Sequence, residues 1–212
     1  MIQIPPAIIC IGRNWAEHAA EMSAAMPTRP TVFMKNPASV IGPGMPVIIP
    51  PVCAEGGPQV DWEGELAVII GRDCREASEE HALDFICGWA VALDITARWW
   101  QKEGSGGQWI RGKSFDTFCP ISELAPADAI VDPQQLTIET RVNGKLMQSG
   151  KTADMIFPVA SLIADLSRGM TLLKGTVILT GTPPGVGAAR TPPVFLRNGD
   201  VVEVDIDGVG HL

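Results

Sequence analysis

Two acidic residues directly before an apolar segment are the feature of this sequence best suited to do chemistry. Glu63 and Glu65 stand two positions apart, and residues 66–70 that follow are all apolar. On a strand both side chains point to the same face, where carboxylates beside a core repel each other and lose hydration. We expect Gly64, between them, to leave room for a ligand. Taken alone, the pair favours the simpler interpretation of a solvated strand end.

A third carboxylate, Asp94, lies in the otherwise apolar run 86–96. A buried aspartate is costly unless it is paired with a cation or binds a metal. Arg98, four residues later, is one available partner. If the two strands are neighbours, however, three carboxylates meet and require a cation. Ligation by oxygen alone, without His or Cys, favours Mg²⁺ or Mn²⁺ over zinc.

A histidine and a glutamate form a second candidate site. Residues 14–22 are a short helical candidate in which His18 and Glu21 share a face at spacing i, i+3. A carboxylate beside an imidazole makes the ring more basic, which suits a general base. A solvated surface histidine is the alternative. Lys113 supplies a cation, and the Gly/Pro loop 180–187 either presents the Thr182 hydroxyl to an anion or is a plain turn.

The elements that must position these residues are mostly strands. Apolar or alternating runs predict strands at 66–70, 86–95, 177–180 and 202–206. Asn143-Gly144 predicts a hairpin turn, with residues 136, 138, 140 and 142 on one face of the strand before it. Helices are predicted to start at Ser78, as N-cap, and at Pro158. The sum is a β-rich α+β fold, mostly antiparallel, with two or three short helices.

Composition narrows the class of protein. The 212 residues suit one domain, and 16 Lys plus Arg against 24 Asp plus Glu give a net charge of −8. Such a chain repels phosphate backbones, so we expect no nucleic-acid partner and no anionic membrane. No apolar run reaches about 18 residues, and no secretory signal is visible. Five scattered cysteines indicate buried free thiols and a cytoplasmic location.

Eight segments in order resemble motifs of the fumarylacetoacetate hydrolase family. The resemblance implies a mixed β-sandwich roll, commonly a homodimer, that holds a divalent metal with three carboxylates. Residues 1–212 would be one catalytic domain of the short, acylpyruvase-like type, with residues 1–50 as an N-terminal segment carrying a lid helix at about 14–22. Trp99-Trp100 departs from the family pattern, in which an acidic residue often follows the arginine. The segments are 11–14 with His18 and Glu21, 33–37, 61–66, 93–98, 113–116, 142–144, 155–157 and 180–183.

The same resemblance assigns roles by position. Glu63, Glu65 and Asp94 match the ligands for Mg²⁺ or Mn²⁺, and His18 with Glu21 matches a catalytic dyad. Lys113 matches a catalytic active-site residue that contacts the metal-bound water or the substrate. The positions that fall in motifs facing the substrate are Arg13, Arg98 and Thr182.

The function expected from these roles is metal-dependent hydrolysis of a C–C bond in a small 2,4-dioxo acid, such as an acylpyruvate or fumarylpyruvate. His18, oriented by Glu21, would deprotonate water, and a metal-stabilised enolate would leave. Degradation of aromatic compounds is the expected context, by family analogy alone. The same site also suits isomerisation of a 2-hydroxyhepta-2,4-diene-1,7-dioate or decarboxylation of oxaloacetate. A non-catalytic scaffold that retains the fold is the alternative from another class.

Overall fold

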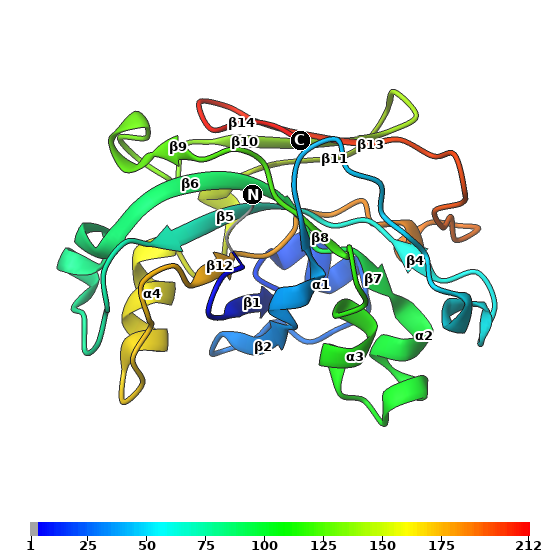
Figure 1. Cartoon of the computed structure of the whole chain (residues 1–212), viewed down its shortest axis with the longest axis horizontal. Helices are drawn as coiled ribbons and strands as arrows, with labels where there is room; N and C mark the ends of the chain where they lie inside the picture. Colours follow the sequence, from blue (N-terminus) through cyan, green and yellow to red (C-terminus); the bar gives the residue numbers. More distant parts are fainter. Residues whose placement is uncertain (1–3) are drawn as a thin grey trace.

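Two facing β-sheets make up the centre of the computed structural model, which describes residues 4–212. In Figure 1 the smaller sheet lies above the larger one. The larger sheet has the strand order β2-β1-β12-β5-β6-β9, and the smaller has the order β11-β10-β13-β14. The strands are β1 (Ile8–Gly12), β2 (Thr31–Lys35), β5 (Gly64–Ile70), β6 (Ile86–Leu93), β9 (Ala125–Pro126), β10 (Thr137–Val142), β11 (Lys145–Lys151), β12 (Val177–Leu179), β13 (Val202–Ile206) and β14 (Gly210–His211).

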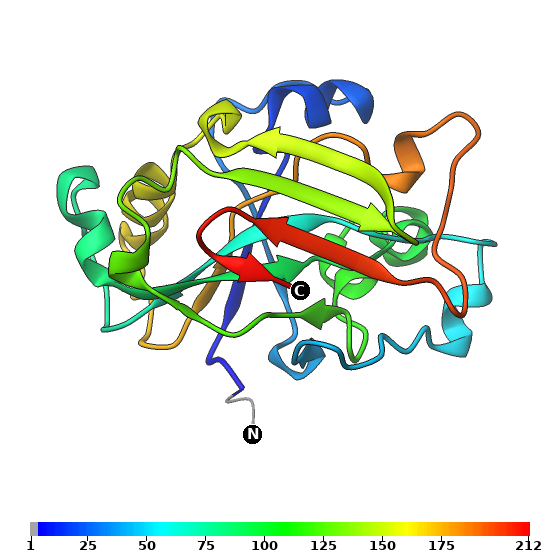
Figure 2. The same ribbon diagram turned by 90° about the horizontal axis from the view of Figure 1, so that it is seen from above.

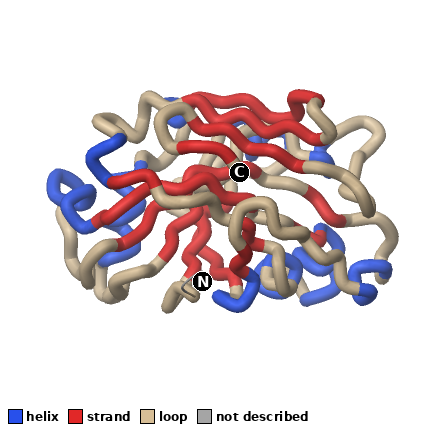
Figure 3. Tube along the Cα trace, turned by 45° about the horizontal axis from the view of Figure 1, so that its top comes forward, coloured by secondary structure: helices blue, strands red, loops and turns tan. Residues whose placement is uncertain are grey.

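Short strand pairs and helices complete the chain. Many of the helical segments lie toward the two ends of the strand layers (Figure 3). The pairs are β3 (Val40–Ile41) with β8 (Cys119–Pro120) and β4 (Val60–Asp61) with β7 (Thr96–Ala97). The α-helices are α1 (Ala16–Glu21), α2 (Arg98–Gln101), α3 (Trp109–Lys113) and α4 (Val159–Ser167). The 3-10 helices are η1 (Pro37–Ser39), η2 (Pro51–Ala54), η3 (Glu79–Phe85), η4 (Glu103–Ser105), η5 (Ala127–Ala129), η6 (Thr152–Asp154) and η7 (Gly187–Ala189).

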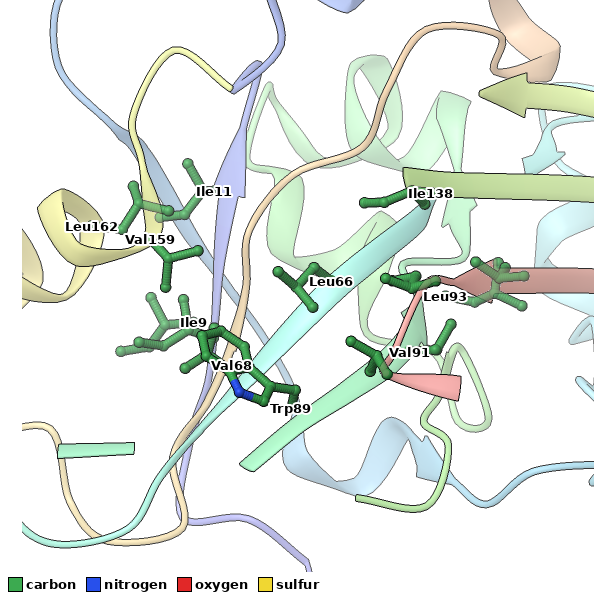
Figure 4. Close-up of a cluster of buried hydrophobic side chains, with 14 of the residues drawn as sticks. Ile9, Ile11, Leu66, Val68, Trp89, Val91, Leu93, Ile138, Val159 and Leu162 are labelled. Carbon is green, nitrogen blue, oxygen red and sulfur yellow. The ribbon is translucent and has the colours of Figure 1, made fainter. Parts of the chain in front are cut away.

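The larger sheet is apolar on both faces. Successive side chains of a strand point to opposite faces, so β5 divides its residues between two clusters. Leu66 and Val68 pack toward the smaller sheet, together with Ile138 of β10 (Figure 4). Ala67 and Ile69 belong to a second cluster on the opposite face. This double burial explains why 66–70 is a continuous apolar run rather than an alternating one.

The smaller sheet covers one face of the larger sheet (Figure 2). Asn143 and Gly144, both with positive φ, form the predicted turn between β10 and β11. Residues 136, 138, 140 and 142 are buried while those between them are half-buried, so the predicted alternation is confirmed. The described strand pairings are antiparallel except β1–β12 and β3–β8.

Three local expectations need correction. Residues 79–85 form the 3-10 helix η3 rather than an α-helix, and the Ser78 side chain makes no capping hydrogen bond. Pro158 is the N-cap of α4 rather than its first helical residue, so this helix begins one residue later than predicted, at Val159. Gly64 does not open space for a ligand, because a Cβ there would collide with Oγ1 of Thr140 on the smaller sheet. Gly64 therefore serves the contact between the sheets.

Over residues 4–212, the structure contains no helix with the length and hydrophobicity needed to cross a bilayer.

Candidate active site

Strand pairing brings the three predicted carboxylates together. Glu63 and Glu65 flank the start of β5, and Asp94 follows the last residue of β6. These antiparallel neighbours place Glu65 opposite Ala92, and the Asp94 amide donates to the Glu63 carbonyl at 2.8 Å. The three side chains are buried, and one oxygen from each lies within 4.8 Å of the others. The site lies on the sheet face opposite the smaller sheet, the face that also carries Ala92.

Lys113 joins two of these carboxylates. Its ammonium nitrogen lies 2.7 Å from Glu63 Oε2 and 2.6 Å from Asp94 Oδ2, and 2.8 Å from the Thr96 hydroxyl. An ammonium group has three protons, so these contacts use all of them. Lys113 therefore holds the carboxylates in place and has no proton left to donate to a substrate in this structure. Contact of Lys113 with the metal-bound water or the substrate, which the family resemblance implies, stays a prediction.

Two further cations neutralise the acidic cluster. Lys35 Nζ lies 2.6 Å from Asp94 Oδ1, and both side chains are fully buried. Arg98 Nη2 lies 2.8 Å from Glu63 Oε1 and 2.7 Å from Asp61 Oδ2. The interpretation of Arg98 as the partner of Asp94 is therefore wrong. Asp94 lies between two lysines that are distant from it in the sequence.

Glu63 and Glu65 have opposite electrostatic environments. Burial alone would raise the pKa of Glu63, but the Lys113 and Arg98 cations outweigh burial and lower this pKa to about 2. Burial, followed by the charges of Asp94 and Glu63, raises the pKa of Glu65 well above its usual range. Glu65 accepts the Gly181 amide at 2.7 Å, and it has no ion pair with any residue in 4–212.

This donor set fits a small divalent cation. Two oxygens on one ion are separated by at most twice the metal–oxygen distance, about 4.2 Å for Mg²⁺ and about 4.8 Å for Ca²⁺. The three oxygens lie within that larger limit. Glu65 is the buried carboxylate that lacks a cation, and hard oxygen donors suit Mg²⁺, Mn²⁺ or Ca²⁺. A divalent ion would provide Glu65 with a positively charged partner.

The predicted dyad forms on α1. His18 Nδ1 lies 2.7 Å from Glu21 Oε1, and Glu21 Oε2 accepts the Gly185 amide at 2.9 Å. A carboxylate only accepts hydrogen bonds, so Nδ1 carries the proton and Nε2 is left to exchange one. His18 is 6% exposed, which excludes the interpretation as a solvated surface residue.

One cavity of about 250 Å³ joins the two predicted sites. Arg13, Lys113 and Arg98 also line this cavity. Of these, Lys113 and Arg98 make the ion pairs described above. Thr182 lines it too, but its hydroxyl already donates to the Gly64 carbonyl at 2.9 Å. The remaining predicted residues at the cavity wall are His18, Glu63 and Glu65.

Comparison with known proteins identifies the family. Residues 7–212 match the model of the fumarylacetoacetate hydrolase C-terminal domain. The chain belongs to the fumarylacetoacetate hydrolase family. The resemblance noted in the sequence is thereby confirmed, together with the mixed, β-rich fold and membership of an enzyme family.

Three members of the fumarylacetoacetate hydrolase family illustrate the range of activities among similar proteins. A Xenopus laevis protein named oxaloacetate tautomerase, mitochondrial, is 47% identical over 98% of this chain. This chain spans 64% of that relative's length. An Exiguobacterium antarcticum structure titled fumarylacetoacetate hydrolase is 45% identical, with TM-score 0.87 over 99% of this chain and 74% of its own. A Mycobacterium smegmatis structure titled 5-carboxymethyl-2-hydroxymuconate delta-isomerase is 38% identical, with TM-score 0.84 over 99% of this chain and 77% of its own.

Sequence reasoning missed three residues that this family member uses to build its site. Asp61 accepts the Arg98 guanidinium and the amides of Gly187 and Ala188, so it ties the loop after β12 to the carboxylate cluster. Lys35 and Gln101 are the other two. Asp61 and Lys35 lie inside segments already matched to the family, which was the available signal. Gln101 lines the cavity and accepts from Arg98, and its spacing i, i+3 from Arg98 was the corresponding signal.

Proposed function

We propose that this chain catalyses the metal-dependent keto–enol isomerisation of a small 2-oxo acid of the oxaloacetate type. The observation that carries the proposal is that His18, which is hydrogen-bonded to Glu21, lines the same cavity as Glu63 and Glu65. The name of the Xenopus laevis relative supports tautomerisation as the reaction. The isomerase title of the Mycobacterium smegmatis structure supports the same class of proton transfer.

Each residue of the site has a separate role in the proposed reaction. Glu63, Glu65 and Asp94 would hold a divalent ion, which supplies Lewis-acid polarisation of the 2-oxo group. His18 Nε2 exchanges a proton with C3 of the substrate, while Glu21 keeps Nδ1 protonated. In the direction from enol to ketone, Nε2 takes the proton of the C2 hydroxyl and then gives a proton to C3, so the imidazole ends in the protonation state in which it began. Lys113 and Arg98 fix the carboxylates that face the cavity.

Hydrolysis of a 2,4-dioxo acid remains a second candidate, because the Exiguobacterium antarcticum structure is titled as a hydrolase. It would use the same dyad to activate a water molecule. Aromatic catabolism, the homodimer and the cytoplasmic location stay predictions. The relatives bear on the last point, since the Xenopus laevis protein is described as mitochondrial.

The test measures three reactions in parallel with Mg²⁺ or Mn²⁺ added. The enol of oxaloacetate is followed by its ultraviolet absorbance, decarboxylation by pyruvate release, and hydrolysis by cleavage of acetylpyruvate. We expect the first reaction to be the fastest relative to its uncatalysed rate. The proposal is wrong if the enol decays no faster with the enzyme than without it.

A histidine variant assigns the proton transfer. His18→Gln should lower the tautomerisation rate about 10²–10⁴-fold, the usual contribution of a positioned acid–base group. His81→Gln is the matched control, because His81 pairs with Asp84 at the same i, i+3 spacing but is exposed. Equal rates in the two variants would contradict the role of His18.

A further inference from the structure

The cations around the cavity fall into two groups. Lys113 and Arg98 contact buried carboxylates at 2.6–2.8 Å, so their charges are already neutralised. Arg13 and Lys102 line the same cavity, and neither lies within 4.0 Å of a carboxylate oxygen of residues 4–212. These two charges are therefore available to an anion that enters the cavity.

The backbone and its neighbours hold Arg13 in place. Arg13 has φ +58°, a left-handed conformation uncommon for a residue with a side chain, at the end of β1. Its guanidinium stacks on Trp109, with 5.3 Å between the guanidinium carbon and the ring centroid. Trp109 itself packs so closely against Gly12 that a Cβ on Gly12 would collide with the ring. The guanidinium is thus positioned at the wall before any ligand binds.

We infer that Arg13 and Lys102 form a subsite for the second carboxylate of the substrate, so that this enzyme selects dicarboxylic 2-oxo acids. The inference rests on the proposed function and names its substrate class. The 2-oxo acid end of the substrate belongs at the carboxylate cluster, where Lys113 has no proton left to donate. The cations at the cavity wall that remain available to bind a second carboxylate are Arg13 and Lys102.

Binding of two unreactive ligands tests the subsite without turnover. Malate and 2-hydroxybutanoate share a 2-hydroxy acid end and differ in a carboxylate against a methyl group. Calorimetry on the protein with Mg²⁺ should show tighter binding of malate. Arg13→Gln should weaken malate binding about tenfold, the loss of one charged hydrogen bond. Lys102→Gln should weaken it about two- to fivefold, because Lys102 is exposed.

The same variants should bind 2-hydroxybutanoate within twofold of the unmodified protein, since this ligand lacks the second carboxylate. Arg111→Gln is the matched control, because Arg111 stacks on Trp100 in the same way but does not line the cavity. It should leave the affinity for both ligands unchanged. An equal loss of both ligands in Arg13→Gln, or an unchanged affinity for malate, would overturn the inference.

An activity measurement separates this inference from the proposed function. Arg13→Gln should raise KM for the enol of oxaloacetate about tenfold with kcat within twofold, because it binds an end of the substrate that does not react. Hydrogen–deuterium exchange at C3 of 2-oxobutanoate should keep its rate. If neither reaction proceeds in the unmodified enzyme while malate still binds through Arg13, the proposed function fails and the dicarboxylate subsite stands.

Discussion

The three carboxylates differ in the partners that balance their charge. Glu63 contacts Lys113 and Arg98, and Asp94 contacts Lys35 and Lys113, at 2.6–2.8 Å. Glu65 receives a single backbone amide from Gly181 and is 2% exposed. A buried carboxylate without a cation is unfavourable. At the scale of single residues, Glu65 is therefore the one of the three carboxylates whose burial a bound metal would stabilise most.

Substitution of Glu65 should separate metal binding from folding. Unmodified protein should melt about 5–10 °C higher when Mg²⁺ or Mn²⁺ is present at about 100 times its Kd. Glu65→Gln keeps an acceptor for the Gly181 amide but removes the charge, so it should abolish most of this shift. Without metal, the variant should be at least as stable as the unmodified protein.

Glu80→Gln, at an exposed position of η3, is the control and should keep the full metal-dependent shift. A thermal melt of Glu65→Gln that still rises by the same amount with metal would contradict the ligand role of Glu65.

At the scale of elements, β5 has a separate task on each face. One face carries Glu65 at the catalytic cavity, and the other packs Leu66 against the smaller sheet. Gly64, between Glu63 and Glu65, has no room for a side chain, because a Cβ there would collide with Thr140 and press on Val204. The start of β5 is thus held by its contact with the smaller sheet, and this contact fixes where Glu63 and Glu65 lie.

Gly64→Ala should therefore lower stability by about 1–3 kcal/mol, the usual cost of overpacking a filled core. Urea unfolding followed by circular dichroism measures this change. The double variant Gly64→Ala with Thr140→Ala should lose less than the sum of the two single variants, because the added methyl group then has space. Strictly additive losses would show that contact with Thr140 is not the cause.

At the scale of the whole molecule, the two sheets and the flanking loops bury four of the five cysteines. Cys87 is the exposed one, so the expectation of buried thiols holds for the other four. Burial raises the pKa of Cys53 to about 11 and of Cys119 to about 12, and it also raises the pKa of Cys10 and Cys74. A raised pKa lowers the fraction of reactive thiolate near neutral pH.

A thiol reagent at pH 8 should therefore modify one cysteine per folded chain quickly and all five after unfolding in guanidinium chloride. Cys87→Ser should remove the fast phase. Rapid reaction of two or more thiols in the folded protein would contradict the buried positions of the other cysteines.

Local residue patterns are enough to predict the main strands, the faces of those strands and the residues able to do chemistry. Side chains alternate between the two faces of a strand, so alternating apolar residues predict a strand with one buried face. Asn143-Gly144 predicts a hairpin turn, because both residues adopt the positive φ that this turn needs. The pair Glu63 and Glu65 follows the same local rule. The dyad of His18 with Glu21 follows from helical spacing.

Which charged groups meet in the site depends on how the whole chain folds. Lys113 reaches Glu63 across 50 residues of sequence, and Lys35 reaches Asp94 across 59. Strand register and chain crossings set such contacts, and local residue patterns do not encode them. The same reason explains why Arg98 pairs with Asp61 and Glu63 rather than with its near neighbour Asp94. That Glu65 lacks a cation partner among residues 4–212 emerges only when all of these pairings are in place.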